Sequence, residues 1–392
     1  AKCIQGKFNF LSMWLRVAVL SLLLWGTSCA KNNPTDPLAN ALSSEDPKIK
    51  KVMDHLDNHE VQVRYTRIDR KNDSIIFTDF DFQVDKNNYF YPASTVKFPA
   101  AVAALEKLNT IDSLSMETRF FVEGDSVETT LAKAISEIFA VSDNAANNRL
   151  VEFLGQDDIN ARMQERGVSP IRIAHRLSTD NADDITTKPI VFYLNDSTTT
   201  LSNPIINSPI RPIDLNGIKK GKGYIADESL QTGPFDFALK NYYPIEAQTA
   251  LLKRIIFPEA FPKDERFNLS NGQRTYLLYA MHTLPPQLGY DPEEFYDSYV
   301  KFFMFGDTTD PMPEHIKIYN KVGYAYGTLT DCAYIKDTEN NIDFMLTATI
   351  LVNSNGIFND NTYEYDEVGI PFLAQLGREI YNYELNRTRG KR

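Results

Sequence analysis

A serine and a lysine three residues apart form a candidate nucleophile and base. Ser94 follows an aromatic-proline turn (Tyr91-Pro92) and opens a predicted helix, and Lys97 lies one turn later on the same face. A serine hydroxyl is a poor nucleophile unless a neighbouring base takes its proton, and a lysine desolvated in a cleft can be neutral enough to do so. The N-terminus of the helix would offer backbone N–H groups and a positive dipole end to a developing oxyanion.

Two further motifs follow in order along the chain. Residues 142–144 read Ser-Asp-Asn between two predicted helices, where we expect Asn144 to cap the second helix. Residues 321–323 read Lys-Val-Gly in a predicted strand that precedes another strand. Because Ser-x-x-Lys alone is expected roughly once by chance in a chain of this length, the signal comes from the ordered combination of the three motifs.

The periodicity of apolar residues predicts the elements that position these motifs. Helical spacing is found over residues 47–59, 94–108, 129–140, 145–154, 243–256 and 371–385. Strand patterns cover residues 61–68, 75–82, 316–326, 329–336 and 342–352. In the last helix, Leu373, Leu376 and Ile380 share one face. Since strands occur at both ends of the chain around a helical middle, we expect one sheet built from both ends.

This distribution predicts an α+β fold, an α/β sandwich within a single catalytic domain over residues 47–392. An antiparallel sheet flanked by the terminal helices would come from residues 47–90 and 310–392, and a mostly helical subdomain from residues 91–309. Residues 186–245 are rich in Thr, Asn, Pro, Gly and Ser and show no convincing periodicity. We therefore interpret them as a long insertion.

The first 28 residues have the pattern of a signal peptide. An apolar run at residues 17–25 follows Arg16 and is too short to span a bilayer as a mature helix. Cys29, directly after small residues, resembles the lipobox cysteine of bacterial lipoproteins, although Gly26 stands where Leu is commoner. Residues 29–46 are polar and contain two prolines, which suits a tether. We expect an exported, lipid-anchored protein of the cell envelope; the alternative is an ordinary secretory signal with Cys29 incidental.

Composition excludes several classes of protein. The 392 residues are 43% apolar and 12% aromatic, unlike a disordered chain. The net charge of −11, which becomes −14 when the three basic residues of the predicted signal are removed, argues against binding of nucleic acid. Three cysteines are too few for a disulfide scaffold, and we expect no disulfide. His55 and His59 lie one helical turn apart without the glutamate of a zinc motif, so neither a metal nor a cofactor is expected.

The ordered motifs resemble those of the penicillin-recognising serine enzymes, most closely the class A β-lactamase-like family, over roughly residues 47 to 387. The resemblance implies a β-lactamase/transpeptidase-like fold. It also implies that Ser94 forms an acyl-enzyme, that Lys97 is its base, and that Ser142 passes a proton to the leaving nitrogen.

The resemblance assigns the remaining motif residues to substrate binding. Asn144 would hold the substrate amide and Lys97, and Lys321 would give electrostatic support to a substrate carboxylate. Gly323 and Tyr324 would lie along the substrate, and the N–H groups of Ser94 and Tyr324 would form the oxyanion hole.

One departure from the family pattern concerns the substrate and another concerns turnover. Val322 stands where the family usually has Thr or Ser, whose hydroxyl binds the substrate carboxylate. Residues 175–181 match the loop that carries the deacylating glutamate; Arg176 fits the arginine of that loop, but Ser178 occupies the place of the glutamate. The sequence of this loop therefore does not indicate fast hydrolysis of β-lactams. The base that replaces the glutamate could be Asp180, Asp183 or Asp184.

The sequence therefore predicts a serine hydrolase that acts on β-lactams or D-amino-acid cell-wall peptides and deacylates slowly. One alternative is an envelope esterase or amidase with another substrate, which would explain the missing carboxylate anchor. A second alternative is a non-catalytic, penicillin-binding-like module. We expect a small molecule or a peptidoglycan peptide as substrate, a membrane as partner through Cys29, no nucleic acid, and a monomer.

Overall fold

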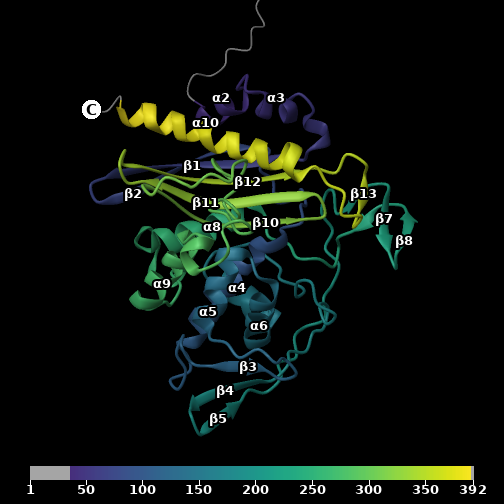
Figure 1. Ribbon diagram of the computed structural model, residues 1–392, viewed down its shortest axis with the longest axis vertical. Helices are drawn as coiled ribbons and strands as arrows, with labels where there is room; N and C mark the ends of the chain where they lie inside the picture. Colours follow the sequence, from purple (N-terminus) through teal and green to yellow (C-terminus); the bar gives the residue numbers. More distant parts are fainter. Residues whose placement is uncertain (1–35, 390–392) are drawn as a thin grey trace, which may run out of the picture. The chain divides into compact units, whose positions relative to one another are not determined.

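A five-stranded antiparallel sheet joins the two ends of the chain. The computed structural model describes residues 36–389, in which the sheet has the strand order β10-β11-β12-β1-β2 (Figure 1). Its strands are β1 (Gln62–Lys71), β2 (Ser74–Phe82), β10 (Ile316–Ala325), β11 (Thr328–Asp337) and β12 (Ile342–Leu351). Val63 of β1 pairs with Ala348 of β12, so the prediction of one sheet built from both ends is confirmed.

Three helices cover one face of this sheet. They are α2 (Pro37–Leu42), α3 (Pro47–Met53) and α10 (Ile370–Arg389), which lie on the same side of the strands in Figure 1. Leu373, Leu376 and Ile380 of α10 are fully buried in the core beneath these helices, as their spacing predicted.

The predicted tether at residues 29–46 is wrong in its C-terminal part. Leu38, Ala41 and Leu42 have the spacing of a helical apolar stripe and are buried in α2. The stripe is one turn long, which is too short for its periodicity to stand out among polar neighbours. The predicted helix at 47–59 is also shorter than expected, because α3 ends at Met53 and a 3₁₀ turn, η1 (Leu56–Asn58), follows it.

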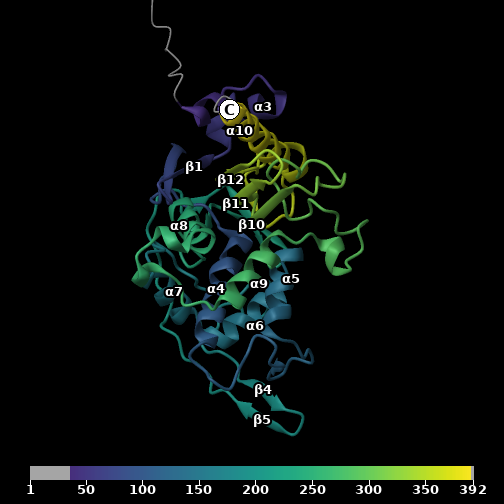
Figure 2. The same cartoon turned by 90° about the vertical axis from the view of Figure 1, so that its left-hand side faces the viewer.

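The middle of the chain folds into helices on the opposite side of the sheet from α10 (Figure 1). They are α4 (Lys97–Leu108), α5 (Leu131–Val141), α6 (Asn144–Leu154), α7 (Gln156–Glu165), α8 (Ile245–Ile256) and α9 (Asn271–His282). Nearly every residue of α4 is buried, which makes it the central helix of this core. Figure 2 shows α9 beside α5, with which it is in contact.

Two of these helices were not predicted. In α7 the buried apolar residues are only Ile159 and Met163, so its apolar stripe is weak. The start of α9 carried a usable signal, because Ser270 and Gln273 form a capping box there.

The predicted insertion at 186–245 contains short strands. They are β4 (Ile190–Asn195), β5 (Thr198–Leu201), β6 (Lys219–Lys220), β7 (Gly223–Ala226), β8 (Ser229–Thr232) and β9 (Phe235–Asp236). These strands form small sheets with one another and with β3 (Phe120–Val122) and β13 (Ile357–Phe358). Strands β5 and β8 are exposed along their whole length, so no apolar alternation marks them in the sequence.

The remaining helical turns are short. They are η2 (Ala93–Val96), η3 (Pro258–Ala260), η4 (Lys263–Glu265), η5 (Pro285–Leu288) and the π-helical turn η6 (Tyr365–Gly369). Within residues 36–389, no helix has the length and apolar character needed to cross a bilayer. The predicted signal segment and Cys29 lie outside the described residues.

Candidate active site

Ser94 lies on a 3₁₀ turn that leads directly into α4. The backbone N–H of Lys97, the first residue of α4, donates to the carbonyl of Ser94, so the predicted helix begins as the 3₁₀ turn η2. Ala93 has a φ of 47°, a left-handed conformation that is uncommon for residues with a side chain. Thr95 closes the turn by donating its hydroxyl to the carbonyl of Pro92 at 2.7 Å. This turn holds Ser94 in the lining of a cavity.

Lys97 and Lys321 meet at the hydroxyl of Ser142. The Nζ of Lys97 lies 3.1 Å from Ser142 Oγ and also donates to the carbonyl of Ser142. The Nζ of Lys321 donates to the same Oγ at 2.8 Å and to the carbonyl of Val322 at 2.8 Å. Because the two lysines occupy the acceptor positions of this oxygen, the hydroxyl hydrogen of Ser142 is left for a third group.

Burial sets the charge of both lysines. The side chain of Lys97 is fully buried, and this desolvation lowers its pKa to about 7 against an opposing effect of Asp143. Burial also lowers the pKa of Lys321 well below its usual range, and the proximity of Lys97 lowers it further. Near neutral pH, Lys97 is therefore neutral in a large fraction of molecules and able to accept a proton.

Asp143, not Asn144, caps helix α6, so the predicted cap is wrong by one residue. The Oδ1 of Asp143 accepts from the N–H of Ala146 at 2.7 Å. Asp is as good a capping residue as Asn, so the choice between the two neighbours depends on where the chain turns. As the first residue of the helix, Asn144 instead lines the cavity.

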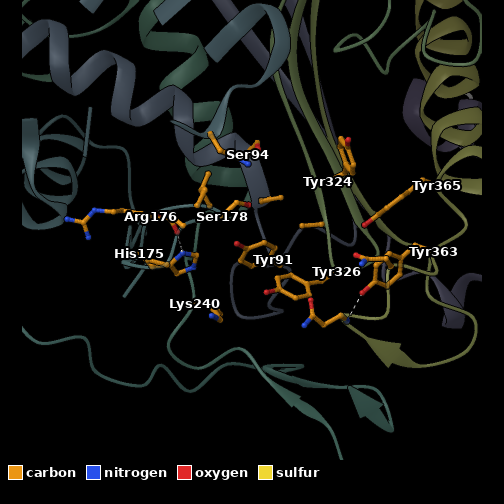
Figure 3. A pocket seen from close by; sticks show the side chains of 18 residues that line it. Tyr91, Ser94, His175, Arg176, Ser178, Lys240, Tyr324, Tyr326, Tyr363 and Tyr365 are labelled. Atoms are coloured by element: carbon orange, nitrogen blue, oxygen red, sulfur yellow. Dashed lines mark hydrogen bonds between the residues drawn. The ribbon is translucent and has the colours of Figure 1, made fainter. Parts of the chain in front are cut away.

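Ser94 and Asn144 line a cavity of about 510 Å³, shown in Figure 3. Tyr324, the third sequence-predicted residue in the lining, follows Gly323 on β10, the edge strand of the sheet. Lys97, Ser142 and Lys321 are absent from the lining. Their hydrogen bonds place the three side chains together, and Lys97 directly follows the turn that carries Ser94.

Most of the cavity wall was not predicted from the sequence. It includes Tyr91, His175, Lys240, Tyr326, Asn359, Asn361, Tyr363 and Tyr365. Tyr91 carried a partial signal, because it precedes the Ser94 motif. His175 begins the loop at 175–181 that the sequence analysis singled out, although that residue was given no role there. The other residues come from the insertion and from loops that follow β10 and β12, where no motif marks them.

The loop at 175–181 is held by a buried ion pair. Arg176 donates to both carboxylate oxygens of Glu152 at 2.7 and 2.9 Å, and to the backbone carbonyls of Asn181 and Asp184. The guanidinium is therefore fully engaged by the protein. Ser178, at the place of the family's glutamate, is exposed, lines the cavity and has a φ of 49°.

No carboxylate lines the cavity within the described residues. Asp180, Asp183 and Asp184 are exposed and none of them belongs to the wall. His175 is neutral, because burial lowers its pKa to about 4. Its Nδ1 donates to the carbonyl of Arg176 and its Nε2 accepts from the N–H of Asn241, so neither nitrogen is free to activate water.

Val322 cannot replace the missing hydroxyl of the third motif. It is buried in the core between the sheet and the terminal helices. Its role in this chain is apolar packing, and a substrate carboxylate would have to find another partner.

The comparisons with known proteins agree with this architecture. The model of the Beta-lactamase enzyme family matches residues 46–203. A β-lactamase from Sphaerobacter thermophilus DSM 20745 is 14% identical over 89% of this chain and 96% of its own, with a TM-score of 0.50. A β-lactamase from Burkholderia vietnamiensis is 14% identical over 86% and 97%, with a TM-score of 0.51. A class A β-lactamase from Mycobacterium abscessus is 14% identical over 89% and 98%, with a TM-score of 0.50.

No curated protein matches the chain. The structural neighbours share its fold, and the family model covers the segment that contains the Ser94 and Ser142 motifs. The chain therefore has the α+β fold of the β-lactamases, and its residues 46–203 are similar to the Beta-lactamase enzyme family.

Proposed function

We propose that this protein is a serine hydrolase that forms an acyl-enzyme on Ser94. The observation that carries this proposal is the environment of Lys97. Its amine is fully buried, has a pKa of about 7 and lies one turn after Ser94 within reach of Ser142. Burial also lowers the pKa of Lys301, but that amine donates to the Met281 carbonyl and Asn320, whereas Lys97 contacts the Ser142 hydroxyl shared with Lys321.

The acylation step follows from this geometry. Neutral Lys97 takes the proton of Ser94 as the serine oxygen bonds to the substrate carbonyl carbon, and the carbonyl becomes an oxyanion. The N–H groups of Ser94 and Tyr324 stabilise that oxyanion. As the carbon–nitrogen bond breaks, Ser142 gives its hydroxyl proton to the leaving nitrogen and recovers one from the protonated Lys97. The acyl group then remains on Ser94 and Lys97 is neutral again.

The proposed substrates are β-lactams or D-amino-acid peptides of the cell wall. An ester or amide substrate of another class is the second candidate, and the burial of Val322 in the core favours it. Both candidates use the same nucleophile, so they differ in recognition of the acyl group and not in the acylation step.

Slow deacylation is part of the proposal. Hydrolysis of an acyl-enzyme needs a base that removes a proton from water, and loss of a general base typically costs about 10²- to 10⁴-fold in the step it serves. The described cavity wall contains no carboxylate, and both nitrogens of His175 are engaged. The acyl-enzyme should therefore accumulate.

Intact-protein mass spectrometry tests the nucleophile directly. The protein is incubated with benzylpenicillin, and the expected result is a mass increase equal to one penicillin that is absent from the Ser94→Ala variant. Ser197→Ala, which removes an exposed hydroxyl in the insertion, is the matched control and should react like the parent protein. Labelling that persists in Ser94→Ala would contradict the proposal.

A further inference from the structure

Lys240 supplies a cation to the cavity that the proposed chemistry does not use. It lies between β9 and α8 in the insertion, is half-buried, and lines the same cavity as Ser94. Arg176, the other basic group in the wall besides the neutral His175, is engaged by Glu152. No ion pair of Lys240 occurs within the described part of the chain, so its charge is available to a ligand.

Two phenol groups lie on the same side of the cavity as Lys240. The rings of Tyr91 and Tyr326 pack edge to face with their centroids 5.1 Å apart. In Figure 3 their hydroxyl ends point toward the side where His175 and Lys240 lie. Burial raises the pKa of both phenols, so they are neutral donors. Neither hydroxyl has a hydrogen-bond partner among the residues that the structure describes.

The residues of the third motif offer no free cation or hydroxyl that could bind an anionic group of the substrate. Val322 has no hydroxyl and is buried in the core. Lys321 is buried, donates to Ser142 and to a backbone carbonyl, and does not line the cavity. Lys240 is therefore the free cation that an anionic group of a ligand in this cavity would contact.

We propose that Lys240, with the hydroxyls of Tyr91 and Tyr326, forms a subsite for a carboxylate of the substrate. The inference rests on the proposed function, because it assigns the acyl substrate of Ser94 a carboxylate that these three residues recognise. Asp183 opposes this subsite: it lies close enough to raise the pKa of both tyrosines, and it is exposed outside the wall. Lys240 and Asp183 should thus affect an anionic ligand in opposite directions.

Binding of hippurate, an acylated amino acid with a free carboxylate, tests the subsite without turnover. Isothermal titration calorimetry is carried out in the Ser94→Ala background with hippurate and with its neutral amide. Lys240→Met should weaken hippurate about tenfold, since a charge-assisted bond is lost, and should leave the amide unchanged. Lys240→Arg should retain most of the binding, and Asp183→Asn should tighten hippurate about two- to threefold.

The matched control is Lys222→Met, which removes an exposed lysine of the same insertion that is not in the cavity wall. It should leave hippurate binding within about twofold of the parent variant. Equal binding by Lys240→Met and its parent, or no binding of hippurate by the parent, would overturn the subsite.

Benzylpenicillin labelling of the wild-type protein, measured in parallel, separates the two proposals. Lys240-dependent hippurate binding without any adduct on Ser94 would support the subsite and refute acylation of Ser94 by a β-lactam. An adduct on Ser94 together with Lys240-independent binding would support the hydrolase and refute the subsite.

Discussion

Gly323 of β10 lies directly against the backbone of Ser94. A methyl group at position 323 would lie 2.7 Å from the amide nitrogen of Ser94 and 2.7 Å from the carbonyl oxygen of Pro92. Both neighbours are backbone atoms, which cannot rotate away as the end of a side chain can. The glycine of the third motif therefore permits the close approach between the edge strand and the nucleophile turn, and thus sets the width of the proposed oxyanion hole.

Gly323→Ala should slow acylation of Ser94. The added methyl group forces β10 and the turn apart, and a displacement on the order of 1 Å in a catalytic geometry can cost about 10²-fold in rate. Stopped-flow measurement of acylation by a chromogenic cephalosporin checks this. Gly272→Ala is the control, because its Cβ in α9 would meet only the Oγ of Ser270, at an ordinary contact distance of 3.9 Å, and the change should leave the rate unaltered. An unchanged acylation rate in Gly323→Ala would show that the strand does not set this geometry.

The rate of acylation should rise with pH through a midpoint near 7. Burial lowers the pKa of Lys97 to about 7, and only the neutral amine can accept the proton of Ser94. The pH dependence of the second-order acylation constant checks this expectation. A rate that is flat between pH 5.5 and pH 8.5, values spanning about 1.5 units on each side of the midpoint, would exclude Lys97 as the base.

The same shift predicts a pH-dependent stability. The pKa of Lys97 is lower in the folded state than in the unfolded state, so the unfolded chain binds more protons between about pH 7 and pH 10.5. Stability therefore rises with pH across this window, by up to about 1.4 kcal/mol per pKa unit. Lys97→Met, which has no charge to bury, should be more stable than the wild type at pH 6. Its advantage should shrink as the pH approaches 10, as denaturant unfolding at both values would reveal.

The elements that carry the three motifs could be predicted because each motif is local. Lys97 follows Ser94 by one turn, and the strand that carries Lys321 has a clear apolar pattern. The cavity wall could not be predicted, because long-range pairing positions it. For example, the loop with Asn359 and Tyr363 follows β13, whose Ile357 pairs in parallel with Gly223 of the insertion. No periodicity within either segment encodes that contact.

The terminal helices show the same distinction. Leu373 and Ile380 of α10 could be assigned to the core because the helix repeats its apolar stripe over several turns. In α2 a single turn buries Leu38 and Leu42, and its sequence cannot be distinguished from a polar tether without the surface that it packs on. Length of the repeat, and not strength of burial, decided which of the two helices could be predicted.

Removal of the Glu152 carboxylate should destabilise the protein substantially. Glu152→Ala leaves the guanidinium of Arg176 buried without its carboxylate, and breaking one side of a buried pair typically costs about 3–5 kcal/mol. The free energy of urea unfolding measures the loss. Glu128→Ala breaks an exposed pair with Arg119 and should cost less than about 1 kcal/mol. Equal effects of the two changes would mean that the pair does not hold the loop.

Cys29 should carry a lipid. The prediction rests on small residues and a cysteine after an apolar run, a pattern that lies outside the described residues. Cells that express the protein are labelled with radioactive palmitate, and the label should disappear in Cys29→Ala. Cys332→Ala is the control, because that thiol is buried in β11 and should not be lipidated. Undiminished labelling of Cys29→Ala would reject the anchor.

A glutamate at position 178 should convert an accumulating acyl-enzyme into one that turns over. The wild type is expected to show a burst of chromogenic cephalosporin cleavage, equal to one equivalent of protein, followed by a slow steady state. Ser178 is exposed in the cavity wall and occupies the place of the family's deacylating glutamate, so a carboxylate there can reach a water near the ester.

Ser178→Glu should raise the steady-state rate at least about tenfold while the amplitude of the burst falls, because a restored base accelerates only deacylation. The left-handed backbone at this position, with a φ of 49°, is already adopted by Ser178, so it adds little cost to the change. Ser178→Gln has the same size and the same backbone cost without the base, and it should retain the burst of the wild type. An equal gain from the glutamine would attribute the effect to loop geometry. A fast steady state in the wild type itself would mean that another group already activates water, and Asp183 would then be the first residue to replace.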